Sequence, residues 1–322
     1  MILGSNPSVS GYRDGLPQLS NGVFLTDGGL ETDLVFHQGI ELPHLAAYIL
    51  LEDEAGVKRL ERYFAEYLVI AGELGTGFVL ESPTWRASES WARRIGTPLE
   101  ALPDLNRKAI DLLAALRDQY AGDVEPIVIS GCLGSPFDAY RPEDSLSEHE
   151  AARYHRSQIA TFSDTRADMV TALTLTNVPE ATGIAREARE QGLPAVISFT
   201  VETDGRLPTG PTLREAIEQV DEATDGAPAY YMINCAYPSH FEPALAPGEG
   251  WTDRIRGLRA NSSSKSHAEL DDSPGLDEGN PAELGAHYRA LLERFPQIRV
   301  LGGCCGTDAR HIRQIAEACA VH

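Results

Sequence analysis

The sequence lacks the segments that would carry a protein into or across a membrane. No stretch approaches the run of about 18 apolar residues that a spanning helix needs, although the hydrophobic fraction of 42% is enough to build a large core. Residues 1–17 are polar and rich in Gly and Pro, with neither a basic start nor an apolar signal-peptide core. We therefore expect a soluble, cytoplasmic protein without a membrane partner.

Basic residues are also scarce. The sequence has 27 Lys and Arg side chains against 48 Asp and Glu side chains, a formal net charge of −21, and no basic patch interrupts this acidity. The electrostatic field of so negative a protein repels nucleic acid. The simplest interpretation of the acidity is a solvated surface that resists aggregation. No Gly-x-Gly-x-x-Gly or Walker-type phosphate loop accompanies a strand and a helix. Nucleic-acid binding and nucleotide-dependent chemistry are therefore not expected.

Cysteine is rare and unevenly spread. The five cysteines of the chain are Cys132, Cys235, Cys304, Cys305 and Cys319. An odd number in a long chain that we assign to a reducing compartment argues against a disulfide framework. Metal binding or catalysis is the better explanation to pursue.

What the sequence does have is a repeated alternation of short apolar runs and longer amphipathic stretches, which predicts alternating strands and helices. The expected strands are Val23–Thr26, Phe78–Glu81, Pro126–Ser130, Met169–Ala172, Ala195–Thr200, Tyr230–Asn234, Ile255–Ala260 and Arg299–Leu301. Eight such strands separated by helices favour a closed parallel (β/α)8 TIM barrel over an open doubly wound sheet. We therefore expect an α/β fold with one domain over residues 1–322.

The expected helices carry the residues that typically begin and end helices. They cover Ala55–Leu74, Leu105–Tyr120, Ser147–Arg166, Pro179–Gln191, Leu213–Ala223, Pro281–Phe295 and Asp308–Ala320. Pro179 suits a first helical turn, Asp308 can accept hydrogen bonds from amides at a helix start, and Gly192 suits a helix end. Residues 261–280, rich in Ser, Asp, Glu and Gly, are expected to form a mobile polar loop insertion that is a candidate lid.

In a TIM barrel the catalytic groups lie on the loops after the strands, and the unusual residues of this chain fall there. The candidates, in chain order, are Asp27, Gly28, Gly29, Gly131 to Pro136, Asn234, Cys235, and the run from Gly302 to Thr307 that contains Cys304 and Cys305. Three cysteines are thus expected at one rim of the barrel.

These three cysteines suit zinc. A catalytic zinc site has three protein ligands and an open fourth position, and Cys235, Cys304 and Cys305 supply that number. Such a site has a net charge of −1 and can hold a substrate thiol as a nucleophilic thiolate. The alternative is that each cysteine is only a small buried side chain, which is the interpretation we adopt for Cys132 and Cys319.

Other candidates have ordinary alternatives. His240 and His311 are the histidines nearest the cysteines in sequence and could supply a fourth ligand, but an isolated histidine is weak evidence for one. Asp27 could orient a cationic or hydrogen-bonding group of a substrate. Because Asp-Gly is also a common turn signal, Asp27 could equally be a turn residue.

These residues together resemble the homocysteine S-methyltransferase family over nearly the whole chain. The resemblance lies in Asp27 to Gly29 with Glu31 and Thr32, Ser82 to Trp85, Gly131 to Pro136, Tyr154 and His155, Ser198 to Thr200, Asn234 and Cys235, and Gly302 to Thr307. It implies a barrel in which Cys235, Cys304 and Cys305 bind Zn²⁺, and a zinc-bound thiolate takes a methyl group from a sulfonium, ammonium, corrinoid or folate carrier. The partners are then a small thiol, first of all homocysteine giving methionine, and a methyl donor. The expected substrate contacts are Asp27, Gly28, Gly29, Trp85 and Asn234.

Two positions depart from the family pattern. Leu173 stands where the family has a glutamate that holds the amino-acid end of homocysteine, and losing such a charge-assisted hydrogen bond costs roughly 1.5–3 kcal/mol. Trp85 stands where the family has a tyrosine. The indole of Trp85 could attract a cationic methyl donor, and ordinary packing is the equally plausible alternative.

Several alternatives stay open from the sequence. The acceptor could be a different thiol, or the same barrel could be a zinc-dependent hydrolase, although such enzymes usually use histidine and carboxylate ligands. A structural zinc in a binding scaffold would need a fourth protein ligand, and none has the right spacing. Because no cobalamin or folate module is evident, we expect a free onium donor. The oligomeric state stays open.

Overall fold

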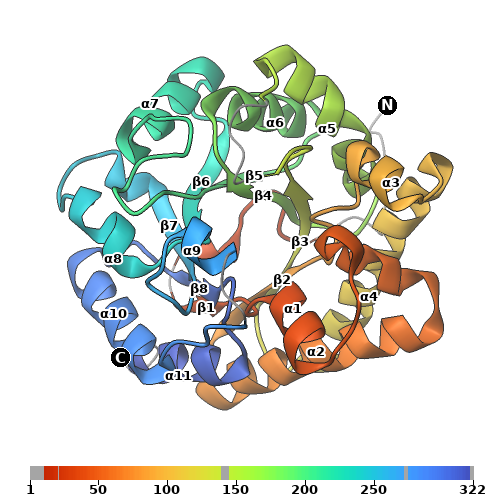
Figure 1. Ribbon diagram of the computed structural model, residues 1–322, viewed down its shortest axis with the longest axis horizontal. Coiled ribbons are helices and arrows are strands. Elements are labelled where there is room, and N and C mark those ends of the chain that lie inside the picture. The colour runs from red at the N-terminus through yellow and green to blue at the C-terminus, as the bar shows by residue number, and fades with distance from the viewer. Residues whose placement is uncertain (1–10, 21, 139–144, 272–274, 320–322) are drawn as a thin grey trace, which may run out of the picture.

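Eight parallel strands form a closed barrel in the computed structural model, which describes residues 11–20, 22–138, 145–271 and 275–319. The strands follow one another around the ring in chain order, and β1 pairs with both β2 and β8, which closes it (Figure 1). They are β1 (Phe24–Leu25), β2 (Gly77–Glu81), β3 (Ile127–Gly134), β4 (Met169–Leu175), β5 (Ala195–Phe199), β6 (Pro228–Asn234), β7 (Ile255–Ala260) and β8 (Val300–Gly303). The (β/α)8 barrel predicted from the sequence is confirmed.

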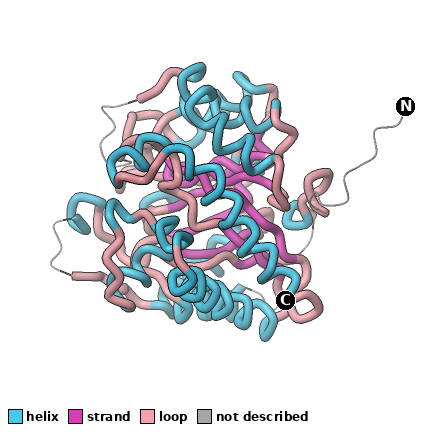
Figure 2. The backbone as a smooth tube through the Cα atoms, turned by 90° about the vertical axis from the view of Figure 1, so that its right-hand side faces the viewer, coloured by secondary structure: helices cyan, strands magenta, loops and turns pink. Residues whose placement is uncertain are grey.

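Helices surround the strands, as the side view in Figure 2 shows. The longer ones are α2 (Glu54–Leu74), α4 (Leu102–Tyr120), α5 (Glu148–Ser163), α6 (Val178–Glu190), α7 (Leu213–Thr224), α10 (Pro281–Arg294) and α11 (Ala309–Cys319). Shorter α-helices lie in the connections, namely α1 (Leu30–Thr32), α3 (Glu89–Ile95), α8 (Pro238–Phe241) and α9 (His267–Asp271). No helix of the described residues is long and apolar enough to cross a membrane.

Local chemistry explains where several helices begin and end. Pro179 lies in the first turn of α6, where its missing N–H is not needed. The Asp308 carboxylate accepts a hydrogen bond from the amide of Arg310 (2.9 Å) at the start of α11. Gly192 follows α6 with φ of 69°, a left-handed conformation that favours glycine. All three sequence predictions of helix ends are confirmed.

The apolar interior has two parts. A large cluster lies between the strands and the surrounding helices, and a small one fills the barrel near the starts of the strands. The small cluster consists of Leu16, Phe24, Val79, Val128, Met169, Val196, Tyr230, Met232 and Val300. Leu16 comes from the N-terminal segment, where Gln18 also donates to the Tyr230 hydroxyl (3.3 Å). This end of the barrel is therefore filled, and the polar groups gather at the opposite end.

The polar segment 261–280 is partly helical, and its predicted role as a lid stays a prediction. It contains α9. Asp277 connects the two halves of the segment, because the Ser262 hydroxyl donates to the Asp277 carbonyl (2.6 Å) and the Ser263 hydroxyl donates to the Asp277 carboxylate (2.9 Å). The amide of Ser262 donates to the carbonyl of Cys305 (3.0 Å), so the segment begins against the cysteine loop. Residues 272–274 of the segment lie outside the described residues.

Candidate metal and substrate site

Three cysteine thiols meet at the C-terminal ends of the strands. Cys235 follows β6, and Cys304 and Cys305 follow β8. All three Sγ atoms lie within 4.8 Å of one another, and the Sγ atoms of Cys235 and Cys305 are 3.5 Å apart. Thiolates on one tetrahedral zinc ion, each at the usual bond length, are separated by about 3.8 Å. The three residues therefore fit a zinc ion closely.

The backbone near the thiols is held in conformations that residues with a side chain rarely adopt. Cys235 has φ of 58°, and Thr174, near the end of β4, has φ of 61°. Each such conformation costs about 1–3 kcal/mol and persists only where the surroundings enforce it. Here the amide of Cys235 donates to the carbonyl of Arg259 (3.1 Å), and the amide of Cys304 donates to the carbonyl of Ala260 (2.9 Å). Both bonds fix the cysteines against β7.

Two glycines predicted as substrate contacts have a clear structural role. A Cβ atom at Gly28 would lie 2.8 Å from the carbonyl oxygen of Thr307, and one at Gly29 would lie 2.6 Å from the carbonyl oxygen of Cys304. The amide of Gly29 also donates to the carbonyl of Thr307 (3.0 Å). Only residues without a side chain allow the β1 loop to lie this close to the cysteine loop.

Asn234 is buried and its side-chain amide is fully engaged. Its Oδ1 accepts from the amide of Thr174 (2.9 Å) and from the hydroxyl of Ser198 (2.6 Å). Its Nδ2 donates to the Thr174 hydroxyl (2.7 Å) and lies 3.8 Å from the Sγ of Cys304. Asn234 therefore supports the Cys304 thiolate from within the protein, and its predicted contact with substrate stays a prediction.

The thiols differ in their acidity. Hydrogen bonds from Cys235 and Cys305, helped by the charge of Arg259 and by Asn234, hold the pKa of Cys304 well below its usual value despite burial. Its neighbours Cys235 and Cys304 raise the pKa of Cys305 well above its usual value. Cys304 is therefore the thiol whose surroundings most favour the thiolate.

A buried ion pair lies directly beneath the cluster. Arg259 on β7 contacts the Asp27 carboxylate (2.8 Å) and donates to the carbonyls of Gly303 (3.0 Å) and Gly28 (3.0 Å). Tyr63 donates to the other carboxylate oxygen of Asp27 (3.0 Å). The Asp27 carboxylate is thus buried and paired within the protein, and its predicted role in orienting a substrate group stays a prediction.

The guanidinium of Arg259 stays charged in this setting. Burial alone would lower the pKa of Arg259, but the Asp27 and Glu81 carboxylates outweigh burial and raise it above its usual value. Burial also raises the pKa of Glu81, at the end of β2, to about 7. Sequence reasoning missed both Arg259 and Glu81, although a charged residue inside an apolar strand was an available signal.

Trp85 is positioned by its neighbours. Its Nε1 donates to the carbonyl of Leu173 (3.3 Å), and the guanidinium of Arg86 lies 3.7 Å from the centre of its indole. Arg86 lies equally close, at 3.7 Å, to the ring of Trp91. Arg86 therefore already occupies one face of Trp85 with a positive charge, and that face is closed to a cationic methyl donor.

The two histidines considered as further ligands are engaged elsewhere. The ring of His240 lies 2.9 Å from the carbonyl of Ser264. His311 contacts the Asp308 carboxylate (3.0 Å) and the carbonyl of Glu278 (2.8 Å). Among the described residues, the group of potential ligands around the thiols consists of the three cysteines alone.

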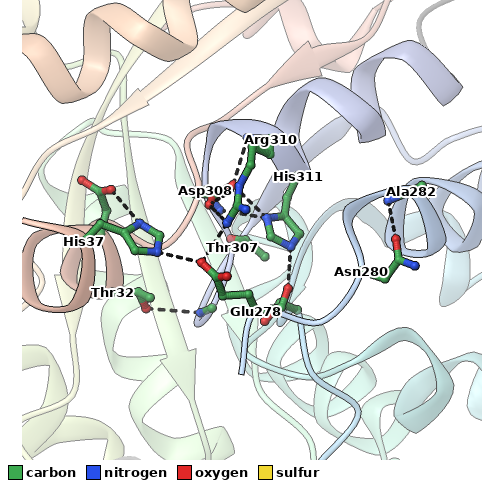
Figure 3. A network of polar contacts seen from close by, with 12 residues as sticks. Thr32, His37, Glu278, Asn280, Ala282, Thr307, Asp308, Arg310 and His311 are labelled. Carbon is green, nitrogen blue, oxygen red and sulfur yellow. Dashed lines mark hydrogen bonds and ion pairs between the residues drawn. The ribbon is translucent and has the colours of Figure 1, made fainter. Parts of the chain in front are cut away.

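A polar network joins the end of the 261–280 segment to the barrel (Figure 3). Glu278 contacts His37 (2.9 Å) and Arg310 (2.8 Å), while His37 also contacts Asp33 (3.1 Å). Arg310 binds Asp308 at the start of α11 (2.5 Å). His37, Glu278 and Asp308 lie close enough to hold a cation, but Arg310 already neutralises both carboxylates. The network is therefore a set of ion pairs.

We expect Glu278→Gln to lower the pKa of His37. Burial lowers this pKa, but hydrogen bonds to Asp33 and Glu278 outweigh burial and raise it above the usual value. The contact therefore stabilises the fold fully below the unfolded pKa of about 6.5 and is lost as pH rises through the higher folded pKa. Titration of the His37 ring by NMR measures the change. Glu293→Gln, at an exposed Arg289 contact, is the control, and an unchanged His37 titration in Glu278→Gln contradicts the prediction.

The fold and the site together define a class of protein: (β/α)8 barrels with a thiol cluster suited to a metal at the catalytic rim. Residues 24–319 match the homocysteine S-methyltransferase family, and the chain therefore belongs to that family. The resemblance seen in the sequence is confirmed, and the protein is an S-methyltransferase.

Similar proteins cover nearly the full length of the chain. Homocysteine S-methyltransferase YbgG of Bacillus subtilis (strain 168) is 26% identical over 91% of this chain and 93% of its own length. Homocysteine S-methyltransferase 4 of Zea mays is 22% identical over 99% of this chain and 96% of its own length. The crystal structure of the homocysteine methyltransferase MmuM from Escherichia coli in its oxidized form has a TM-score of 0.72, with 18% identity over 92% of this chain and 96% of that chain. Its metallated form gives a TM-score of 0.69, with 18% identity and the same coverage.

Proposed function

We propose that the protein is a zinc-dependent methyltransferase that transfers a methyl group from a small onium donor to homocysteine. The observation that carries this proposal is the gathering of Cys235, Cys304 and Cys305 at the strand ends of a barrel of this family. These three residues would be the protein ligands of zinc. With a substrate thiol in the remaining position, the metal would supply a positive charge that lowers the pKa of that thiol, so that its sulfur would stay nucleophilic near neutral pH.

The surrounding residues maintain the charge of this site. Three thiolates repel one another, and the nearby guanidinium of Arg259 offsets part of that repulsion. Asn234 directs an N–H toward Cys304, which favours the thiolate over the thiol. Both residues are buried, so their interactions with the thiolates are little screened by water.

The methyl transfer needs no base from the protein. The acceptor sulfur forms a bond to the methyl carbon while the bond from that carbon to the onium atom breaks. The bonding electrons stay on the onium atom, which becomes neutral, and the donor leaves with one positive charge fewer. The acceptor thiol gives its proton to solvent before the transfer. A cationic donor also suits this acidic protein, whose net charge of −21 attracts cations.

One observation favours a different thiol as a second candidate acceptor. Leu173, near the end of β4, is partly exposed and apolar where a carboxylate would bind the ammonium group of an amino acid. Hydrolysis is less well supported, because three thiolate ligands damp the ability of zinc to activate water and the nearby histidines are engaged elsewhere.

We expect the purified protein to contain one zinc per chain and to form methionine from homocysteine with an onium donor. S-methylmethionine, S-adenosylmethionine and betaine are tested separately as donors, with methionine quantified by mass spectrometry. The control is the same reaction after removal of zinc by a chelator, and activity should return when zinc is added back. Zinc without methionine formation would overturn the homocysteine assignment and favour another acceptor, whereas activity that survives chelation would overturn the zinc assignment.

A further inference from the structure

Glu31 is a carboxylate in the mouth of the barrel to which the mechanism above assigns no role. It lies in α1, directly after Gly28 and Gly29. Its two flanks are fixed to the cysteine loop, because Gly29 lies against the carbonyl of Cys304 and the Thr32 hydroxyl accepts from the amide of Gly306 (3.2 Å). The backbone of Glu31 is therefore held beside the thiol cluster.

The charge of the Glu31 carboxylate acts on several residues around this mouth. It interacts with Cys304 after β8, with Asp27 after β1 and with Arg86 in the loop after β2, and its charge also acts on Cys132 in β3. These residues lie in or directly after four neighbouring strands of the ring, β8, β1, β2 and β3, so the Glu31 carboxylate is within electrostatic range of the thiol cluster.

The Glu31 carboxylate has properties that suit the recognition of a cation. Its side chain is partly exposed, and it forms no hydrogen bond or ion pair with another side chain of the described residues. The protein around it removes enough water that desolvation raises its pKa to about 7. A cation that pairs with it would replace the missing solvation, and the pairing would be little screened.

We propose that Glu31 is a specificity-determining residue whose carboxylate binds the ammonium group of an aminothiol acceptor. This inference rests on the proposed thiol methylation. The thiol of such an acceptor lies at the cysteine cluster, and its ammonium group extends across the mouth to Glu31. Leu173, which is apolar, supplies no competing charge on the other side of the opening. Glu31, in the loop after β1, thus provides a negative charge in the opening, whereas the apolar Leu173 near the end of β4 provides none.

The test compares thiols that differ in the ammonium group. Isothermal titration of the zinc-loaded protein gives dissociation constants for homocysteine against 4-mercaptobutanoate, and for cysteamine against 2-mercaptoethanol. In the wild type we expect each aminothiol to bind roughly tenfold to a hundredfold more tightly than its counterpart. In Glu31→Gln that ratio should collapse toward one, with affinity for the two amine-free thiols and the zinc content unchanged.

Asp33→Asn is the matched control, because it removes a carboxylate two residues away that is already paired with His37. It should leave the ratios as in the wild type. Equal ratios in wild type and Glu31→Gln, or no preference for either aminothiol in the wild type, would overturn the inference. The titration needs no methyl donor, so a protein that shows the preference and transfers no methyl group contradicts the proposed function and leaves the assignment of Glu31 standing.

Discussion

Cys304→Ser is expected to release zinc from the purified protein and to abolish methyl transfer while the barrel stays folded. Serine has the size of cysteine, so packing at the end of β8 is preserved, but a neutral hydroxyl replaces the thiolate. Mutation of a residue that hydrogen-bonds to a metal ligand typically lowers metal affinity by about 10–100-fold. Loss of the ligand itself should lower it by more than roughly a hundredfold. Zinc per chain after dialysis, with circular dichroism as the folding check, measures the effect.

Cys304 is the most informative of the three cysteines to change. Its thiol is the one whose pKa the surroundings lower, through Cys235, Cys305, Arg259 and Asn234. Cys319→Ser is the matched control, because Cys319 is partly buried on α11 and lies outside the cluster. One zinc per chain in Cys304→Ser would show that this thiol is not a ligand, whereas loss of zinc in Cys319→Ser would show that the assay reports general damage.

The sequence was sufficient to predict which cysteines meet, because strand ends in a parallel barrel share one rim. Cys235 and the Cys304–Cys305 pair each follow a recognisable apolar strand, and the structure places those strands, β6 and β8, on either side of β7. Strand ends were less predictable. β3 and β4 extend to Gly134 and Leu175, beyond the predicted Ser130 and Ala172, because ladder pairing between the two strands compensates for residues of weak strand propensity.

Contacts between distant residues explain what the sequence could not show. The local signal at Asp27 is that of a turn, and nothing in that signal reveals Arg259, which lies more than two hundred residues later and binds its carboxylate. Glu31 is similar, because its position beside Cys304 depends on how closely Gly29 lies to the cysteine loop. The sequence identifies which residues have suitable chemistry, whereas their partners follow only from the closed barrel.

Arg259→Met is expected to lower the free energy of unfolding by about 3–5 kcal/mol, the usual cost of removing one partner of a buried ion pair. Methionine fills a similar volume, so the loss comes from leaving Asp27 and Glu81 buried without their cation. The carbonyls of Gly28 and Gly303 also lose their donor. Urea denaturation of the zinc-free protein measures the change. Arg256→Met on the same strand is the control, because Arg256 is only partly buried, and its effect should stay below about 1 kcal/mol.

The dependence of this loss on pH separates a charge effect from a packing effect. Burial already raises the folded-state pKa of Asp27 and Glu81 above the unfolded value, and because Arg259 lowers both, its removal should raise them further. A carboxyl group with a raised folded-state pKa contributes stability that disappears as pH rises through that pKa. The deficit of Arg259→Met should therefore be larger at pH 8 than at pH 5.5. Adding Asp27→Asn should recover part of it at pH 8, because one uncompensated charge is removed. A deficit that is equal at both pH values and unaffected by Asp27→Asn would mean that Arg259 acts through packing and hydrogen bonds alone.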